Sequence, residues 1–418
     1  MKRSMYVIGI LLTAALAPMA SYAQSANPLT IDEALRLSLD SQPGLDAYGR
    51  TASAFEEAAV AAEQLPDFRL FGGVRGFPVT EDTAFSYDAE PFTASFIGIG
   101  RRQTPRARRR ADAARLIAEA SSSEAERELL ARRIEREVLL AWTATIEAEE
   151  QQALLQSLID DREGRYSAAE ANIPTGRASP ADAIAARADI TLVRAEIADA
   201  RGAEAVGRAA LSRWIGDAAE RRLSGHLPIC RLTNLEVARQ SISDHPQLLL
   251  AGSRNTVADR AIDVARADRQ PEWGWSVRYE QRSGGRADFV GFELSIDLPF
   301  NRSRLQDRRL AEASELAAAS RDRLEDTRRD LLASLDAAIA RMDAAQTRLR
   351  TTAEEIYPAL RAAEQAQEAR YAGGGGSLES VLIASDRATR IALDLVEQRA
   401  AVARASAELY YYTEECDI

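Results

Sequence analysis

Hydrophobic and polar residues alternate in short stretches of the chain, and long segments with a helical pattern separate these stretches. From Trp273 to Tyr279 every second residue is apolar or aromatic, and the run from Val290 to Leu298 alternates in the same way. A spacing of two is typical of a strand with one apolar face. Aromatic-rich runs earlier in the chain predict a similar pair. We therefore expect two β-hairpins, with strands at about 67–77 and 91–100 and at about 272–282 and 288–298.

Each predicted hairpin precedes a helical segment of unusual length. Residues of about 106–171 include no proline and one glycine, and residues of about 302–372 include one proline, Pro358, and no glycine. Apolar residues recur at helical spacing, as in Ile134 and Val138. At about 1.5 Å per residue, such a helix is close to 100 Å long. Coiled-coil-like packing is the expected way to bury its apolar stripe.

A shorter helix is predicted to return after each long one, from Pro180 to Ile215 and from Leu378 to Tyr412. A returning helix of this length covers only about half of its long neighbour and leaves apolar surface unburied. The opening helical segments, about 30–64 and 232–269, have roughly the missing length. We therefore expect each opening segment to stack end to end with the returning helix of its half.

The sequence also repeats itself. "LTIDEALRLSLDSQP" starts at Leu29 and "LTNLEVARQSISDHP" starts at Leu232, and both reach a proline at the same offset. Internal repetition is a strong indicator of architecture. The expected fold is mainly α with a small β part, in two repeats, 24–231 and 232–418. Each repeat contains a helix, a β-hairpin, a long helix and a shorter helix.

The N-terminal residues have the pattern of a secretory signal peptide. A basic start, an apolar stretch and the sequence "MASYAQ" fit cleavage after Ala23, so residues 1–23 are expected to be removed. No later stretch approaches the roughly 20 continuous apolar residues of a membrane helix. If the mature chain lies in a membrane, it does so without membrane helices.

The charge balance argues against a nucleic-acid partner. The formal net charge is -11 and Lys2 is the only lysine, so the mature basic charge comes from arginine. The exception is the arginine-rich run "RRQTPRARRR" at residues 101–110. Because this run joins a predicted strand to a predicted helix, an interfacial role competes with polyanion binding.

No catalytic or metal-binding arrangement is evident, and we expect neither an enzyme nor a cofactor. His226 and His245 both lie near prolines, as expected of turns, and two histidines and four methionines form no soft metal cluster. The glycine run at residues 373–376 lacks the Gly-Lys-Ser/Thr ending of a phosphate loop. Cys230 and Cys416 could form a disulfide in an exported chain; two unpaired thiols are the alternative.

Over nearly the whole mature chain, these motifs resemble those of the TolC family of outer-membrane efflux proteins. The likeness rests on the paired openings, on "VGFELSIDLPFNR" running into "RRLAEA", and on the tip sequences "RYSAAEANIPTGRASPAD" and "RYAGGGGSLESVLIAS". The order and the tips are most similar to the heavy-metal (CzcC-type) efflux subgroup. The resemblance implies a homotrimer in the outer membrane of a Gram-negative bacterium, with a shared β-barrel and a periplasmic α-helical barrel. Four strands from one chain are too few to close a barrel, which needs about eight.

The implied function is the outer-membrane channel of a tripartite efflux system. Such a channel passively conducts substrate from an inner-membrane pump and a periplasmic adaptor protein to the exterior. The similarity to the heavy-metal subgroup suggests metal cations as the substrate, and drugs or a secreted polypeptide are the alternatives. The exit duct of a type I protein secretion system and a periplasmic coiled-coil adaptor or scaffold are the alternatives. The duplicated helical hairpin disfavours an adaptor, which encloses one such hairpin. Outer-membrane lipid is a further expected partner, and run 101–110 would lie near its anionic headgroups or on a solvated face.

The resemblance also assigns roles to individual residues. The tips, at about 172–179 and 373–377, would dock the adaptor and gate the entrance. Relatives often carry acids where this chain has Ser380 and Ile383, and nearby Glu379 and Asp386 could substitute. The docking candidates are Thr175, Gly176, Ser179, Asp182, Gly373, Gly374, Gly375, Gly376, Ser377, Leu378 and Glu379. The candidate membrane-facing or interfacial aromatics are Phe68, Phe71, Phe92, Phe96, Trp273, Trp275, Tyr279 and Phe292.

Overall fold

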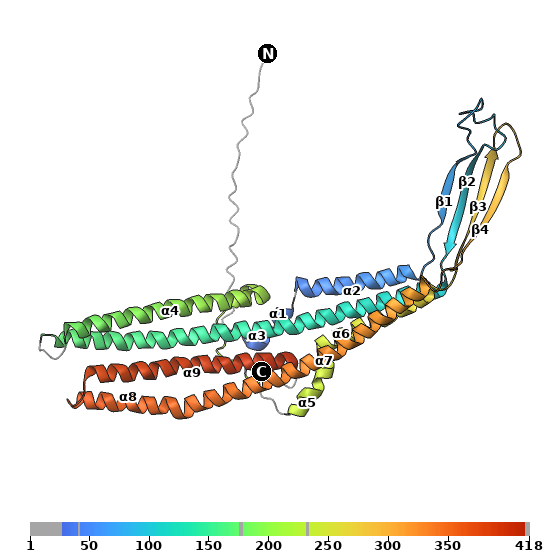
Figure 1. Ribbon diagram of the computed structural model, residues 1–418. Coiled ribbons are helices and arrows are strands. Elements are labelled where there is room, and N and C mark those ends of the chain that lie inside the picture. Colours follow the sequence, from blue (N-terminus) through green and yellow to red (C-terminus); the bar gives the residue numbers. More distant parts are fainter. Residues whose placement is uncertain (1–26, 41, 175–178, 231–233, 414–418) are drawn as a thin grey trace, which may run out of the picture.

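A computed structural model describes residues 27–40, 42–174, 179–230 and 234–413. Long helices run side by side, and a small β-sheet stands at one end of them (Figure 1). The predicted signal peptide, 1–23, lies outside the described residues. The fold class is confirmed: the protein is mainly helical with one small antiparallel sheet.

In the first half, the other helices pack along one uninterrupted helix, α3. It has 67 residues, whereas the returning helix α4 has 36. As predicted, α2 and α4 follow one another along α3, with the short α1 between them (Figure 1). The elements are α1 (Ile31–Leu39), α2 (Pro43–Ala62), β1 (Arg69–Arg75), β2 (Ala94–Gln103), α3 (Arg106–Asn172), α4 (Pro180–Ile215) and a 3-10 turn, η1 (Gly216–Glu220).

The second half has the same order of elements, but its opening segment and its long helix are interrupted by short turns. The opening segment is divided between α5 and α6, and the returning helix is α9. The elements are α5 (Leu235–Gln240), a 3-10 turn η2 (Ser241–Asp244), α6 (Pro246–Ala267), β3 (Glu272–Arg282), β4 (Phe289–Asp297), α7 (Gln306–Thr351), a π turn η3 (Thr352–Ile356), α8 (Tyr357–Ala372) and α9 (Leu378–Tyr412).

The prediction of a continuous helix over 302–372 is wrong at two places. The helix begins only at Gln306, because the preceding residues form turns in which the Asn301 carbonyl accepts from the Arg304 amide. It is then interrupted by the π turn Thr352–Ile356, directly before Pro358. Proline has no amide hydrogen, and its ring collides with the carbonyl four residues earlier. A locally widened turn accommodates that ring without ending the rod.

The four strands form one antiparallel sheet in the order β1-β2-β3-β4. Each half supplies one adjacent pair, β1 with β2 and β3 with β4, and β2 pairs with β3 across the two halves. The sheet therefore joins the two repeats into one unit.

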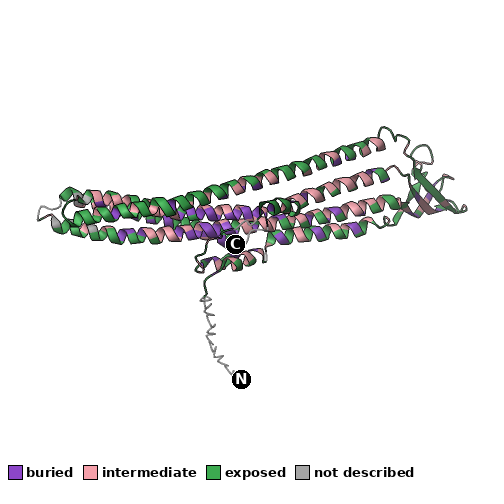
Figure 2. Ribbon diagram, turned by 90° about the horizontal axis from the view of Figure 1, so that it is seen from below, coloured by how far each residue is buried: buried purple, intermediate pink, exposed green. Residues whose placement is uncertain are grey.

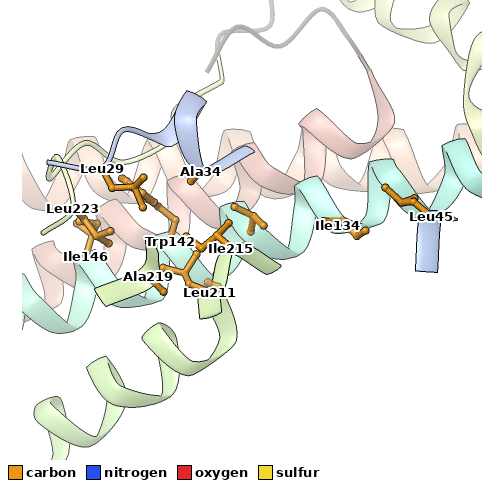
Figure 3. Close-up of a cluster of buried hydrophobic side chains, with 12 residues drawn as sticks. Leu29, Ala34, Leu45, Ile134, Trp142, Ile146, Leu211, Ile215, Ala219 and Leu223 are labelled. Carbon is orange, nitrogen blue, oxygen red and sulfur yellow. The ribbon is translucent and has the colours of Figure 1, made fainter. Parts of the chain in front are cut away.

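The hydrophobic core lies where the rods of each half overlap. Buried positions gather about the middle of the helical part (Figure 2), and the largest fully buried side chain is Trp142 of α3. Leu211 and Ile215 of α4 lie around it, as do Leu29 and Leu223 (Figure 3). The Trp142 indole nitrogen donates to the carbonyl of His226 at 2.8 Å, so its one polar atom is satisfied. The second half has a separate core between α7 and α9, around Leu335 and Leu409.

One hydrogen bond occurs in both halves at equivalent places. The Gln42 side chain, just before Pro43, donates to the carbonyl of Trp214, the penultimate residue of α4. His245, just before Pro246, contacts the carbonyl of Tyr411, the penultimate residue of α9, at 3.0 Å. Each bond ties the start of an opening helix to the end of the returning helix. The repetition seen in the sequence thus extends to individual contacts.

Candidate functional site

The sheet has one apolar face, and most of it is exposed. The register places Val277 between Ile99 and Phe292, and Trp275 beside Leu294, in agreement with the predicted alternation. A continuous exposed apolar surface of this kind marks contact with lipid or with another protein. Its apolar residues are Leu70, Val74, Ile97, Ile99, Trp273, Trp275, Val277, Tyr279, Val290, Phe292, Leu294 and Ile296.

The opposite face carries charge. Glu280 is almost fully buried between two arginines, with a carboxylate oxygen 2.5 Å from Arg75 Nη2 and the other 2.7 Å from Arg278 Nε. Arg278 also pairs with Glu293 at 3.3 Å. These ion pairs reach across the sheet from β1 to β4 and make this face polar. Single strands do not reveal them, because the partners come from β1, β3 and β4.

The aromatic residues chosen from the sequence divide between the two faces. Trp273, Trp275, Tyr279 and Phe292 share the apolar face, while Phe68 and Phe92 lie just outside the ends of β1 and β2. The register does not support a membrane-facing role for Phe71 and Phe96, because both lie on the charged face. There each ring lies over a glycine of the neighbouring strand: a Cβ at Gly98 would come within 2.6 Å of Phe71 Cζ.

The sheet has two unpaired edges among the described strands. β1 and β4 each pair with one neighbour only. Exposed edges normally recruit another strand or are protected by charges or prolines. The edge strand β4, "FVGFELSID", contains no proline; it is apolar on one face and carries its two acids, Glu293 and Asp297, on the other. Both edges are therefore suited to pairing with another chain.

The arginine run at residues 101–110 lies at the junction of the sheet and the helices, as predicted. Part of it is occupied by structural contacts. Arg108 pairs with Asp112 and Asp268, and Arg109 donates to the carbonyls of Thr104 and Glu63. Asp268 and Glu63 come from remote segments, so the sequence alone could not separate paired from unpaired arginines.

The tip between α8 and α9 is built by its glycines. The α8 helix ends in a Schellman motif: Gly375 N–H donates to the Arg370 carbonyl, and Gly374 N–H donates to the Tyr371 carbonyl. Gly374 has a φ of +78°, which favours glycine. Ser377 caps α9 by accepting from the Ser380 amide at 3.2 Å. Glu379 lies in the first turn of α9 and is exposed.

The other tip is described only in part. Thr175 and Gly176 lie outside the described residues, and Ser179 directly precedes α4. Near the tips, Asp386 of α9 bridges Arg162 of α3 at 3.2 Å and Arg390 of its own helix at 2.8 Å. A cavity of about 310 Å³ lies beside this bridge. The sequence suggests Asp386 as a substitute acid at the entrance. It does not indicate the pairing with Arg162, because that residue comes from a remote helix.

Further ion pairs join the two helical hairpins along α3 and α9. Glu147 pairs with Arg404 at 2.6 Å, and Glu150 pairs with Arg399 at 2.8 Å. Burial raises the pKa of Glu147, although Arg404 lies beside it. The two repeats are thus connected by charged contacts along the helices as well as by the sheet.

The histidines and the described cysteine have structural surroundings. His245 caps α6 through Nδ1, which accepts from the Gln247 amide, so Nε2 carries the proton that is donated to Tyr411. Burial lowers the pKa of His245 to about 4. Cys230 is buried and disulfide-bonded, while Cys416 lies outside the described residues, so their pairing stays a prediction. Within the described ranges, no group of three or more His, Cys, Asp or Glu could hold a metal ion.

None of the helices in the described part of the chain has both the length and the apolar character needed to cross a membrane.

Comparisons with known proteins agree with this architecture. The family described as outer membrane efflux protein matches residues 237–413, most of the second repeat. No curated protein matches the sequence. A membrane protein from Pseudomonas aeruginosa is similar in structure, with a TM-score of 0.77 and 16% identity over 91% of this chain and 93% of that chain.

Two further solved structures are similar over the same share of this chain. The outer membrane protein VceC from Vibrio cholerae has a TM-score of 0.74 and 17% identity, over 91% of this chain and 95% of that chain. CusC, described in terms of transmembrane channel formation, has a TM-score of 0.74 and 16% identity, over 91% of both chains. At these identities the likeness establishes the fold, and this chain shares it over nearly its whole described length.

Proposed function

We propose that this protein is the outer-membrane channel of a tripartite efflux system, acting as a homotrimer in the outer membrane of a Gram-negative bacterium. The observation that carries the proposal is the sheet. It has one exposed apolar face, one charged face and two unpaired edges, and it stands at the end of helical rods close to 100 Å long. The family match over residues 237–413 supports the same proposal.

In the proposed assembly, strand β4 of one copy pairs with β1 of the next. Three copies of a four-stranded sheet supply twelve strands, which is within the range of natural outer-membrane barrels. The apolar faces then meet lipid, and the charged faces line a water-filled lumen. Phe71 and Phe96 then face the lumen, while Trp273 and Tyr279 face outward.

The helices continue the conduit away from the membrane into the periplasm. Transport through it is passive: substrate diffuses along a hydrated passage, and the protein performs no catalytic step. The rods of three copies enclose the passage, because α2 and α4 at one edge of the chain meet α7 and α8 of the next copy.

The tips form the periplasmic entrance and dock the adaptor protein of an inner-membrane pump. The docking residues are those assigned in the sequence: Thr175, Gly176, Ser179 and Asp182 of the first tip, and Gly373 to Gly376, Ser377, Leu378 and Glu379 of the second. The short glycine-rich loop of the second tip supports this role, because Gly373, Gly374 and Gly375 are exposed. Metal cations are the proposed cargo, on the likeness of the tips to the heavy-metal subgroup, and the pump selects them.

An exit duct for a type I protein secretion system is the second candidate, since it requires the same barrel and conduit. The alternative of a periplasmic adaptor or scaffold is disfavoured by the exposed apolar face of the sheet. A scaffold that stays in water would expose Val290 and Phe292 at 74% and 70% without a partner.

Two neighbouring residues of β4 provide the test. Lysine at Phe292, on the apolar face, should prevent insertion into a planar bilayer, because lysine at the membrane midplane costs about 2–4 kcal/mol per copy. Lysine at Glu293, on the charged face, should leave insertion intact and shift the ion selectivity toward anions. Conductance of the wild type and both variants is the measurement. A wild type that forms no channel, or a Phe292→Lys variant that conducts normally, would refute the proposal.

A further inference from the structure

One arginine of the run at residues 101–110 lies on the apolar face of the sheet. Arg101 pairs in register with Trp275 of β3, and Gln103 pairs with Trp273. The same face continues through Ile99 and Ile97 away from the helices. Arg101 therefore lies at the margin of the apolar surface, where β2 leads into α3.

The side chain of Arg101 is held in place without a carboxylate. Its Nε donates to the Pro66 carbonyl at 2.9 Å, and its guanidinium carbon lies 4.6 Å from the ring centre of Phe68. The Phe68 ring is in turn packed edge to face against Trp275, at 6.2 Å. No described acidic side chain forms an ion pair with Arg101. A cation is thus fixed on an aromatic platform with part of its donor fork unused.

Three other arginines of the run have partners within the protein, in contrast to Arg101. Arg102, the next residue, points to the charged face and pairs with Glu272 at 3.7 Å. Arg108 pairs with Asp112 and Asp268, and Arg109 reaches the carbonyl of Glu63 at the end of α2. Each of these three has a partner that explains it.

Arg106 and Arg110 resemble Arg101 in this respect. They are one helical turn apart in α3, both are exposed, and neither forms an ion pair with a described residue. They also lie at the N-terminal end of a 67-residue helix whose first turn contains no acid. That end carries the positive pole of the helix dipole, so cations there are unfavourable and an anion is favoured.

We propose that Arg101 holds the phosphate of an anionic phospholipid headgroup at the helix-proximal margin of the apolar face, and that Arg106 and Arg110 add positive charge at the same junction of sheet and helices. The site rests on the proposed function, since it needs the sheet to lie in a bilayer. Arginine forks match phosphate geometry, and tryptophans such as Trp273 and Trp275 prefer the depth of the headgroups. The lipid tails would then cover the apolar face, and the headgroup would neutralise the cations at the start of α3.

The test uses the full-length protein in phosphatidylcholine vesicles that contain a minor share of brominated lipid. Trp142 and Trp214 lie in the helices, so a quencher confined to the bilayer reports on Trp273 and Trp275. Brominated phosphatidylglycerol should quench their fluorescence more than the same share of brominated phosphatidylcholine. Arg101→Gln should reduce this preference about fivefold, as expected for one arginine near an anionic surface.

Two variants control for charge and for folding. Arg101→Lys should keep most of the preference, and Arg102→Gln, one residue along but on the other face, should behave as the wild type. Equal quenching by the two lipids in the wild type would overturn the site, and so would an Arg102→Gln variant that loses the preference as Arg101→Gln does. Loss of the preference on adding inorganic phosphate at constant ionic strength would contradict a lipid headgroup.

The same experiment separates this site from the proposed function. If neither brominated lipid quenches the wild type, the sheet does not lie in the bilayer, and the channel proposal falls together with the site. If both lipids quench every variant equally, the sheet is inserted and only the headgroup site is refuted.

Discussion

The two halves of the chain contain the same elements, but equivalent elements pack against different numbers of neighbours. The long helix of the first half, α3, is packed by α2, α4, α6 and α9. Its counterpart α7 has its main contacts with α6 and α9 only. The sheet shows the same asymmetry, because β2 and β3 lie inside it and β1 and β4 lie at its edges. Equivalent helices and strands of the two repeats thus differ in environment: some lie inside the chain's fold, and others lie at its edge.

This difference explains how one repeated sequence could serve an assembly. The elements that have few neighbours within one chain fall into two different sets. One set is β1 and α2 of the first half, and the other is β4 and α7 of the second half. A head-to-tail contact between such unlike surfaces forms a closed ring when the rotation between copies closes. The incomplete coverage of the second half is therefore what the proposed trimer requires.

The largest expected difference between centre and edge is at Trp142. Replacing this fully buried residue of α3 with alanine should cost about 3–5 kcal/mol of unfolding free energy, because it leaves a cavity and an unpaired carbonyl at His226. Leu316→Ala in α7, where the side chain is 57% exposed, should cost less than about 0.5 kcal/mol in the separated subunit. Denaturant unfolding measures both. Equal costs would remove the distinction between the two long helices.

The second prediction concerns a covalent link between the two halves. Cys230 lies at the end of the first repeat and Cys416 at the end of the second, and we predict that the disulfide of Cys230 is with Cys416, the other cysteine of the chain. Replacing both with serine should lower the unfolding free energy by roughly 2–4 kcal/mol. A reducing agent should have the same effect on the wild type and none on the double variant. Recovery of two free thiols from the unreduced protein would contradict the pairing.

The third difference is the effect of acid on the two equivalent hydrogen bonds, from Gln42 to the Trp214 carbonyl and from His245 to the Tyr411 carbonyl. His245 has a pKa of about 4 in the folded chain and 6.5 as the ordinary value, so the unfolded state takes up a proton first as the pH falls. This residue's contribution, about 3 kcal/mol, is complete above pH 6.5 and is lost as the pH approaches 4. Gln42, at the same place in the first half, does not titrate.

Replacing His245 with glutamine tests the role of this hydrogen bond. His245→Gln can still donate to the Tyr411 carbonyl, as Gln42 does to Trp214, and should lose about 1 kcal/mol from the weaker helix cap at every pH. Its unfolding free energy should fall less than that of the wild type between pH 6.5 and 4. An unchanged acid sensitivity would show that other groups cause it.

The smallest expected effect is at the contact that joins the halves near the tips. Asp386→Asn removes the ion pair with Arg162 and should cost less than about 1 kcal/mol, because both side chains are partly exposed to water. A double-mutant cycle with Arg162→Gln measures their coupling. A coupling of several kcal/mol would mean that the halves are locked together at the tips and not mainly through the sheet.

The sequence predicted much of this comparison because periodicity and repetition are local. The strands, the helical rods and the end-to-end stacking of α2 and α4 followed from spacing and length. The π turn before Pro358 was not predicted, since proline indicates a disturbance but not which kind of turn absorbs it. In β1 the adjacent Leu70 and Phe71 gave no alternation from which to choose a face.

Contacts between remote segments could not be predicted. The pairing of Glu280 with Arg75, and of Asp386 with Arg162, depends on which strands and helices become neighbours. The same limit applied to the arginine run, where Asp268 and the end of α2 decide which arginines have partners. The fold was therefore more accessible from the sequence than the site.

The most direct test of the uneven coverage is the native mass of the mature protein, extracted from the outer-membrane fraction in mild detergent. We expect three copies, because the edges β1 and β4 and the uncovered sides of α2 and α7 need partners. Loss of the trimer in the Phe292→Lys variant, but not in the Glu293→Lys variant, would connect the mass to the sheet. A stable monomer that remains in aqueous solution would contradict the central claim.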